Sequence, residues 1–131
     1  MDLQLRRRCT AAGAAALTVA LALGLRSATD GVFAKAAGDA LYTVLLHALL
    51  VLAAPRLRPA TAAGAALALS WAVEFFQLTP VPAHLAQHST AARLILGSTF
   101  NIPDLAWYVA GAALSLMVHL GLTARRRPAR A

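Results

Sequence analysis

The 131-residue sequence has few charged residues and fewest of all acidic ones, with five Asp and Glu against twelve Lys and Arg. Charged residues make up 13 % of the chain and hydrophobic residues 60 %. Soluble domains average about 25 % and about 45–50 % respectively. A soluble domain of this length leaves too much of its surface exposed to hide so many apolar side chains. The shortage of charge therefore excludes an ordinary soluble domain and predicts one domain embedded in a lipid bilayer.

The sequence also lacks a cysteine pair and the common catalytic motifs. The single cysteine, Cys9, excludes an internal disulfide, and we interpret it as an inert apolar residue near a helix start. GxSxG, HExxH, GxGxxG and a phosphate-binding loop are all missing. His84 and His88 lie four residues apart, but zinc needs three or four ligands, so we expect no metal site and no cofactor. His47 and His119 are expected to form hydrogen bonds inside the fold.

The net charge of +7 is concentrated near the two ends of the chain. Three arginines occupy positions 6–8, and four more occupy positions 125–127 and 130. A nucleic-acid-binding surface needs basic residues on one face, commonly interleaved with aromatic residues, and no such stripe is present. Basic clusters that flank apolar segments are instead typical of membrane proteins. We therefore expect the lipid bilayer, and not nucleic acid, as a partner.

Four apolar segments, rich in Ala and Leu and without the alternation of strands, predict helices at about 9–26, 38–54, 60–78 and 104–124. Each is close to the length of about 20 residues that crosses a bilayer. The stretch PRLRP (55–59) predicts a tight connection. Residues 79–103 predict a longer extracytoplasmic loop, whose middle fits a short helix that lies on the surface or dips into the membrane. The expected fold class is all-α, a four-helix transmembrane bundle in one domain (1–124), followed by a basic cytoplasmic tail (125–131).

Lys and Arg divide unevenly between the two sides of this predicted bundle. Nine lie on the side of the termini, and three, Arg26, Lys35 and Arg93, lie on the other. The positive-inside rule then places both termini in the cytoplasm and the connections 26–38 and 79–103 outside. The first segment has 17 uncharged residues after Arg8, more than the 7–15 or so of a signal-peptide core, so we expect it to be retained. The predicted location is the inner or plasma membrane, crossed several times.

The polar residues of the predicted helices fall on matching faces at the outer end. Glu74 and Gln77 share one helical face, and Asp104 and Tyr108 share another. In lipid such faces turn toward the bundle interior, because polar groups are costly in hydrocarbon. Arg93 is the expected counter-ion, since carboxylates gathered without a cation repel one another. The expected polar cluster has seven members: Asp39, Tyr42, Glu74, Gln77, Arg93, Asp104 and Tyr108.

A structural role is open for each of these acids. Asp39 and Asp104 stand at predicted helix starts, where a carboxylate commonly caps the helix. Glu74 lies within an apolar helix, where an ionisable side chain is a functional candidate, but a structural pair with Arg93 is an alternative.

Three stretches together resemble a bacterial family of small integral membrane proteins, the domain-of-unknown-function family 2809. They are GDALY (38–42), VEFFQL (73–78) and AARLILGSTFNIPDLAWYVAG (91–111), and the resemblance covers roughly residues 10–122. The E-x-x-Q pattern followed by Arg and Asp is also distantly similar to VanZ-like proteins, which are linked to glycopeptide-antibiotic resistance. Here Asp104 is followed by LAWY rather than by that group's Asp…Asn…Gly arrangement. Neither resemblance implies a particular reaction.

Three classes of function follow from this cluster. In the first, which we predict, it binds a polar or anionic headgroup of a lipid or envelope precursor, with Arg93 taking the anionic group. In the second, the protein is a membrane-embedded enzyme in which Glu74 is the general acid or base and Arg93 stabilises a developing anion. In the third, the cluster only locks the bundle of a structural or partner subunit. The sequence leaves open whether the protein is an enzyme and what its oligomeric state is.

Overall fold

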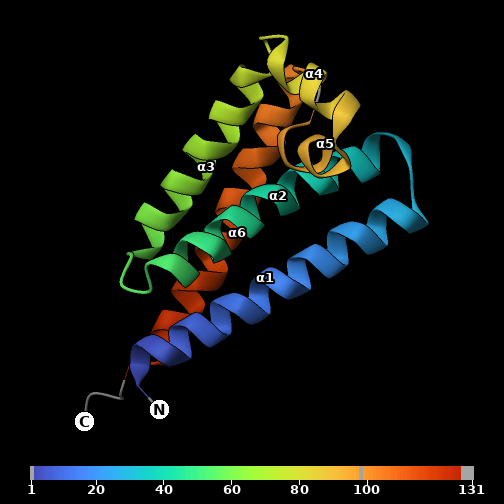
Figure 1. Ribbon diagram of the computed structural model, residues 1–131. Helices are drawn as coiled ribbons and strands as arrows, with labels where there is room; N and C mark the ends of the chain where they lie inside the picture. The colour runs from blue at the N-terminus through green and yellow to red at the C-terminus, as the bar shows by residue number, and fades with distance from the viewer. Residues whose placement is uncertain (1, 98, 128–131) are drawn as a thin grey trace.

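The computed structural model describes residues 2–97 and 99–127, and in this part of the chain every regular element is a helix, without a strand (Figure 1). Four of its helices are long and apolar enough to cross a membrane, by length and composition. They are α1 (Leu3–Ala28), α2 (Gly31–Ala53), α3 (Pro59–Phe76) and α6 (Ile102–Arg125). Two short helices, α4 (Val81–His88) and α5 (Thr90–Leu96), connect α3 to α6. The predicted fold class, an all-α bundle of four transmembrane helices, is confirmed.

Helix α2 begins further toward the N-terminus than the sequence pattern predicts. It starts at Gly31, directly after the short turn that ends α1, and Gly31 has a φ of 74°. Glycine adopts that left-handed conformation without steric cost, so the chain reverses there and not at Gly38. Asp39, expected at the helix start, therefore lies two turns inside α2, and Lys35 becomes a helical residue one turn before it.

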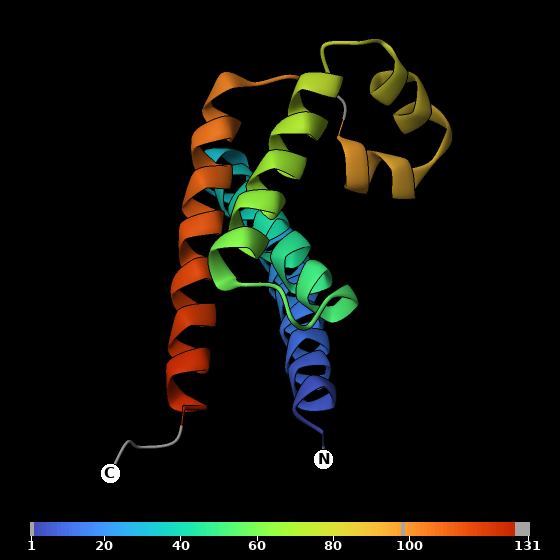
Figure 2. The ribbon, with the colours of Figure 1, turned by 90° about the vertical axis from the view of Figure 1, so that its left-hand side faces the viewer.

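Helix α2 is the centre of the bundle, because it packs against α1, α3 and α6, and α6 also packs against α3 (Figures 1 and 2). The residues between the helices are small: Ala62 and Ala66 of α3 are fully buried. Large apolar side chains point outward, as Met117 does with 70 % of its surface exposed. Small residues inside and large apolar residues outside are the pattern of helices that pack in lipid.

One glycine marks the closest approach between α2 and α6. A Cβ atom added at Gly111 would overlap the backbone carbonyl of Ala40. The two helix backbones therefore meet at a spacing that only glycine permits on the α6 side.

The two ends of the bundle differ. The start of α1 and the end of α6 lie at one end, where Arg126 donates a hydrogen bond to the Thr10 hydroxyl at 2.9 Å (Figure 2). Nearby, within the bundle, His47 Nε2 and His119 Nδ1 are 2.9 Å apart, as an interior hydrogen-bonded pair requires. Helices α4 and α5 lie at the opposite end, which we call the distal end. The predicted polar cluster falls at this distal end.

Candidate functional site: a polar cluster at the distal end

Glu74 is enclosed between α3 and α6. Its side chain is 0 % exposed. One carboxylate oxygen accepts a hydrogen bond from the Asn101 backbone N–H at 2.7 Å, and the other accepts from the Tyr108 hydroxyl at 2.8 Å. Each oxygen thus has a donor, which satisfies the requirement that a buried carboxylate be hydrogen-bonded. These bonds tie the last turn of α3 to the start of α6.

Lys35 is the cation that lies beside the carboxylates. Its Nζ atom is 2.5 Å from Oδ2 of Asp104 and 3.6 Å from Oδ2 of Asp39, so it joins α2 to α6. The Asp104 side chain is 5 % exposed, and that of Lys35 is half exposed. The counter-ion expected from the sequence was Arg93, and a second helix beginning at residue 38 put Lys35 in the preceding loop. The i, i+4 spacing of Lys35 and Asp39 was the available signal for this residue.

Arg93 lies apart from the carboxylates. It is exposed on α5 and forms no ion pair with any residue that the structure describes. The expected Glu74–Arg93 pair is therefore not formed, because Glu74 takes both of its donors from α6 and the segment before it.

Tyr42 and Gln77 complete the cluster in different ways. The Tyr42 ring lies 6.2 Å from the Tyr108 ring, centroid to centroid. The Gln77 amide nitrogen donates to the backbone carbonyl of Leu96 and so holds the end of α5 against the end of α3. Gly97 follows with a φ of 67°, and a Cβ atom there would overlap the Gln77 amide.

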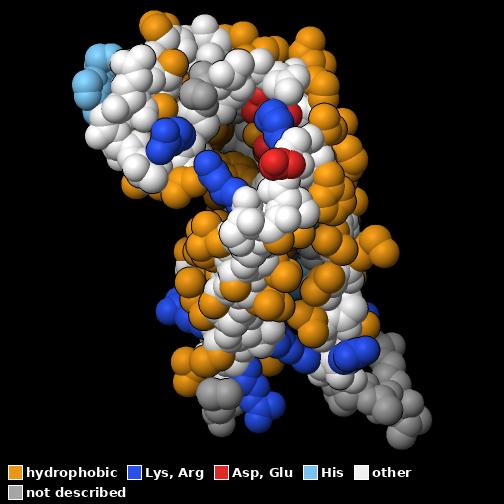
Figure 3. All heavy atoms as spheres, turned by 90° about the vertical axis from the view of Figure 1, so that its right-hand side faces the viewer, with side chains coloured by type: hydrophobic (Ala, Val, Ile, Leu, Met, Phe, Trp, Pro, Cys, Tyr) orange, Lys and Arg blue, Asp and Glu red, His pale blue; other side chains and the backbone are white. Residues whose placement is uncertain are grey.

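A hollow of about 1110 Å³ lies between the distal ends of α1, α2 and α6 and helix α5. We call it the distal cavity. Figure 3 views the molecule from the right-hand side of Figure 1 and shows acidic and basic side chains gathered around this cavity. Its charged lining residues are Arg26, Asp30, Lys35, Asp39, Arg93 and Asp104, and its polar ones include Tyr42, Gln77, Asn101 and Tyr108. Of the seven expected site residues, six line this cavity, and Glu74 lies behind the wall.

The cavity wall offers both acceptors and donors. The acceptors are the carboxylates of Asp39 and Asp104, which line the cavity beside Lys35. Arg26 and Arg93 make no ion pair within the same part of the chain. A wall with both carboxylates and unpaired guanidinium groups favours a ligand that carries donor groups together with an anionic group.

His84 and His88, expected to be too few for a metal site, are not among the residues that line this cavity. His84 and His88 lie side by side on α4, with ring centroids 4.9 Å apart. Among the described residues, no group of three or more His, Cys, Asp or Glu side chains is placed to hold a metal ion.

Sequence reasoning missed two contributors to the cluster, Lys35 and Asn101. Asn101 acts through its backbone N–H, so its side-chain identity gives no signal.

Thr43 and Ser70 add a buried contact deeper in the bundle, where their hydroxyl oxygens lie 2.8 Å apart.

Comparison with known proteins gives a family and no function. No curated protein matches the chain. No solved structure matches it either. The family model described as "Protein of unknown function (DUF2809)" matches residues 28–112, about two thirds of the chain. This span includes all seven expected site residues and Lys35. The resemblance to family 2809 is confirmed over these residues, and the chain belongs to the DUF2809 family.

Proposed function

We propose that this integral membrane protein binds the polar headgroup of an amphipathic molecule in the distal cavity. The observation that carries the proposal is the cavity itself, about 1110 Å³ in volume and lined by both signs of charge. Small-molecule sites enclose about 300–1,000 Å³. The distal cavity is therefore large enough for a complete headgroup rather than for an ion alone.

One part of the cavity suits an anionic group. Arg26 at the end of α1 and Arg93 on α5 both line it, and no described carboxylate pairs with either. Guanidinium groups present planar sets of donors that match phosphate or carboxylate oxygens. These two arginines would hold the phosphate or carboxylate of the headgroup.

Another part of the cavity suits donor groups on the same ligand. Asp39 and Gln77 both line it, and the partly exposed carboxylate of Asp39 is a hydrogen-bond acceptor. An ammonium or hydroxyl group of the ligand would donate to this carboxylate. The favoured headgroup thus carries a phosphate or carboxylate together with an amine or several hydroxyls, as phospholipids and envelope precursors do.

The distribution of basic residues supports an outer location for this cavity. The end of the bundle that carries the termini has eight of the eleven Lys and Arg residues that the structure describes. By the positive-inside rule that end faces the cytoplasm, and the distal cavity opens outside the inner or plasma membrane. A headgroup of the outer leaflet, or a precursor delivered there, is the corresponding ligand.

The geometry favours binding over acid–base catalysis by Glu74. A general acid or base must come within hydrogen-bond reach of its substrate. Glu74 has no exposed surface, and both of its oxygens are already bonded. Glu74 instead holds α3 against α6 behind the cavity, as expected if the cluster locks the bundle. That lock and a ligand in the cavity are compatible.

Titration with lysophosphatidylethanolamine tests the proposal, because its headgroup carries a phosphate and an ammonium. The dissociation constant is measured by calorimetry on protein in an uncharged detergent. We expect Arg93→Gln to weaken binding at least about tenfold, since hydrogen bonds to charged groups contribute about 1.5–3 kcal/mol. Asp39→Asn, which keeps the shape and removes the charge, weakens it as well.

Arg58→Gln is the matched control. Arg58 is an exposed arginine in the 55–58 connection, at the end opposite the cavity. Its substitution leaves the dissociation constant unchanged. Equal affinities for the Arg93→Gln variant and the Arg58→Gln variant would leave only the structural lock as the role of the cluster.

A further inference from the structure

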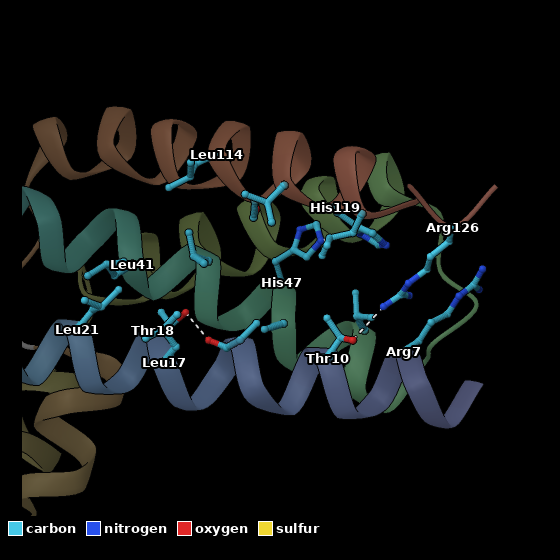
Figure 4. A pocket seen from close by; sticks show the side chains of 18 residues that line it. Arg7, Thr10, Leu17, Thr18, Leu21, Leu41, His47, Leu114, His119 and Arg126 are labelled. Carbon is cyan, nitrogen blue, oxygen red and sulfur yellow. Dashed lines mark hydrogen bonds between the residues drawn. The ribbon is translucent and has the colours of Figure 1, made fainter. Parts of the chain in front are cut away.

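A second hollow lies between α1 and α6 with α2 as its floor, toward the end where α1 begins (Figure 4). We call it the terminal groove, and it encloses about 330 Å³. Its lining is mostly aliphatic and includes Ala14, Leu17, Leu21, Leu41, Leu114 and Leu122. The polar cluster of the distal end contributes nothing to it. This groove therefore needs an explanation of its own.

Two arginines stand at one end of the terminal groove. Arg7 comes from α1 and Arg126 directly follows α6, and Figure 4 shows both side chains beyond the aliphatic lining. Arg126 donates to the Thr10 hydroxyl, and Arg7 donates to the backbone carbonyl of Pro55 at 3.2 Å. Neither pairs with a carboxylate in the described part of the chain. A guanidinium has five N–H donors, so each retains donors for an anion.

The dimensions of the groove select its occupant. The lining on α1 extends from Arg7 to Leu21, which is about 21 Å at 1.5 Å per residue. One acyl chain reaches across half of the hydrocarbon core, or about 15 Å. An aliphatic groove of this length, with two arginines at one end that pair with no described carboxylate, therefore matches an acyl chain joined to an anionic headgroup.

We propose that the terminal groove binds one acyl chain of an anionic phospholipid, with its phosphate held by Arg7 and Arg126. The chain lies along the aliphatic lining between α1 and α6. The headgroup lies at the membrane surface beside the start of α1. The bound lipid joins α1 to α6, two helices whose side chains are linked at this end by the Arg126–Thr10 hydrogen bond.

Native mass spectrometry of protein released from nanodiscs tests this site. The nanodiscs contain equal amounts of dioleoyl phosphatidylglycerol and dioleoyl phosphatidylcholine, so that only the headgroup differs. The wild-type protein is expected to retain phosphatidylglycerol preferentially. Each basic residue contributes about fivefold to anionic-lipid binding, so Arg7→Gln combined with Arg126→Gln lowers the preference by about 25-fold. Arg58→Gln, which removes an arginine on the same side of the bundle, keeps the preference.

A second pair of variants tests the acyl-chain position. Ala14 lines the groove, and Ala16, also exposed on α1, does not. Ala14→Trp fills the groove and reduces the retained phosphatidylglycerol at least fivefold, whereas Ala16→Trp does not. Arg93→Gln also leaves this retention intact, which separates the terminal groove from the distal cavity. An unchanged lipid preference in the double arginine variant would overturn the proposal. Equal lipid retention by the two tryptophan variants would overturn it too. A wild-type dimer that only Ala14→Trp disrupts would also overturn it.

Discussion

The Tyr108 hydroxyl is the most informative single group to remove. It donates to Glu74 across 2.8 Å, and Tyr108 is 5 % exposed, so no solvent replaces the lost bond. In Tyr108→Phe, Glu74 keeps one donor, the Asn101 backbone N–H. Hydrogen bonds between membrane helices contribute about 0.6 kcal/mol on average. Hydrogen bonds to a charged group contribute about 1.5–3 kcal/mol, and we expect Tyr108→Phe to lower the free energy of unfolding by an amount in this higher range.

The chain offers a matched control for this change. Tyr42 lies beside Tyr108, and its hydroxyl has no hydrogen-bond partner among the described residues. Tyr42→Phe therefore removes the same atom with a change in stability below about 0.5 kcal/mol. The free energy of unfolding is measured in mixed micelles by titration with a denaturing detergent.

A double-mutant cycle assigns the loss to the contact with Glu74. Combining Tyr108→Phe with Glu74→Gln gives a coupling energy that excludes effects of either change alone. We expect at least about 1 kcal/mol of coupling. If Tyr108→Phe costs no more than Tyr42→Phe, or the cycle shows no coupling, then Glu74 does not fasten α3 to α6.

Three further predictions address packing and topology. Gly111→Ala places a Cβ against the α2 backbone and lowers the free energy of unfolding by about 1–3 kcal/mol. Gly121→Ala, with open space around it, leaves the free energy of unfolding unchanged or raises it, and equal effects of the two changes contradict the close approach of α2 and α6. Gly97→Ala meets both a left-handed backbone and the Gln77 amide, so it costs at least about 1 kcal/mol by the same titration, and a neutral result contradicts that turn. In a protein that lacks Cys9, a membrane-impermeant maleimide is expected to label Ala91→Cys in intact cells and Arg58→Cys only after lysis. The opposite labelling pattern would reverse the proposed orientation.

The fold was predictable because hydropathy and length alone define four membrane-crossing helices. The inward polar face of α3 was predictable as well, since Ser70 and Glu74 are one turn apart and both are fully buried. The start of α2 was not, because the decision between Gly31 and Gly38 depends on a turn that tertiary packing selects. That one boundary placed Lys35 outside the expected cluster and gave its role to Arg93.

The partners of Glu74 show a second limit of the sequence. Tyr108 was in the expected cluster, and its spacing from Asp104 turned it inward. The Asn101 N–H carries no side-chain signal, and only the path of the chain between α5 and α6 brings it to the carboxylate. The distal cavity likewise depends on where α5 lies, which no periodicity in residues 79–103 indicates.

Acidic and basic side chains from different helices meet at the distal end. Exchanging the charges of Lys35 and Asp104 tests it most directly, because their contact joins α2 to α6. Lys35→Asp and Asp104→Lys are each expected to lower the thermal midpoint in an uncharged detergent. The double variant restores the opposite charges and recovers at least half of the summed loss. A double variant that loses the full sum of the two single changes would contradict the account.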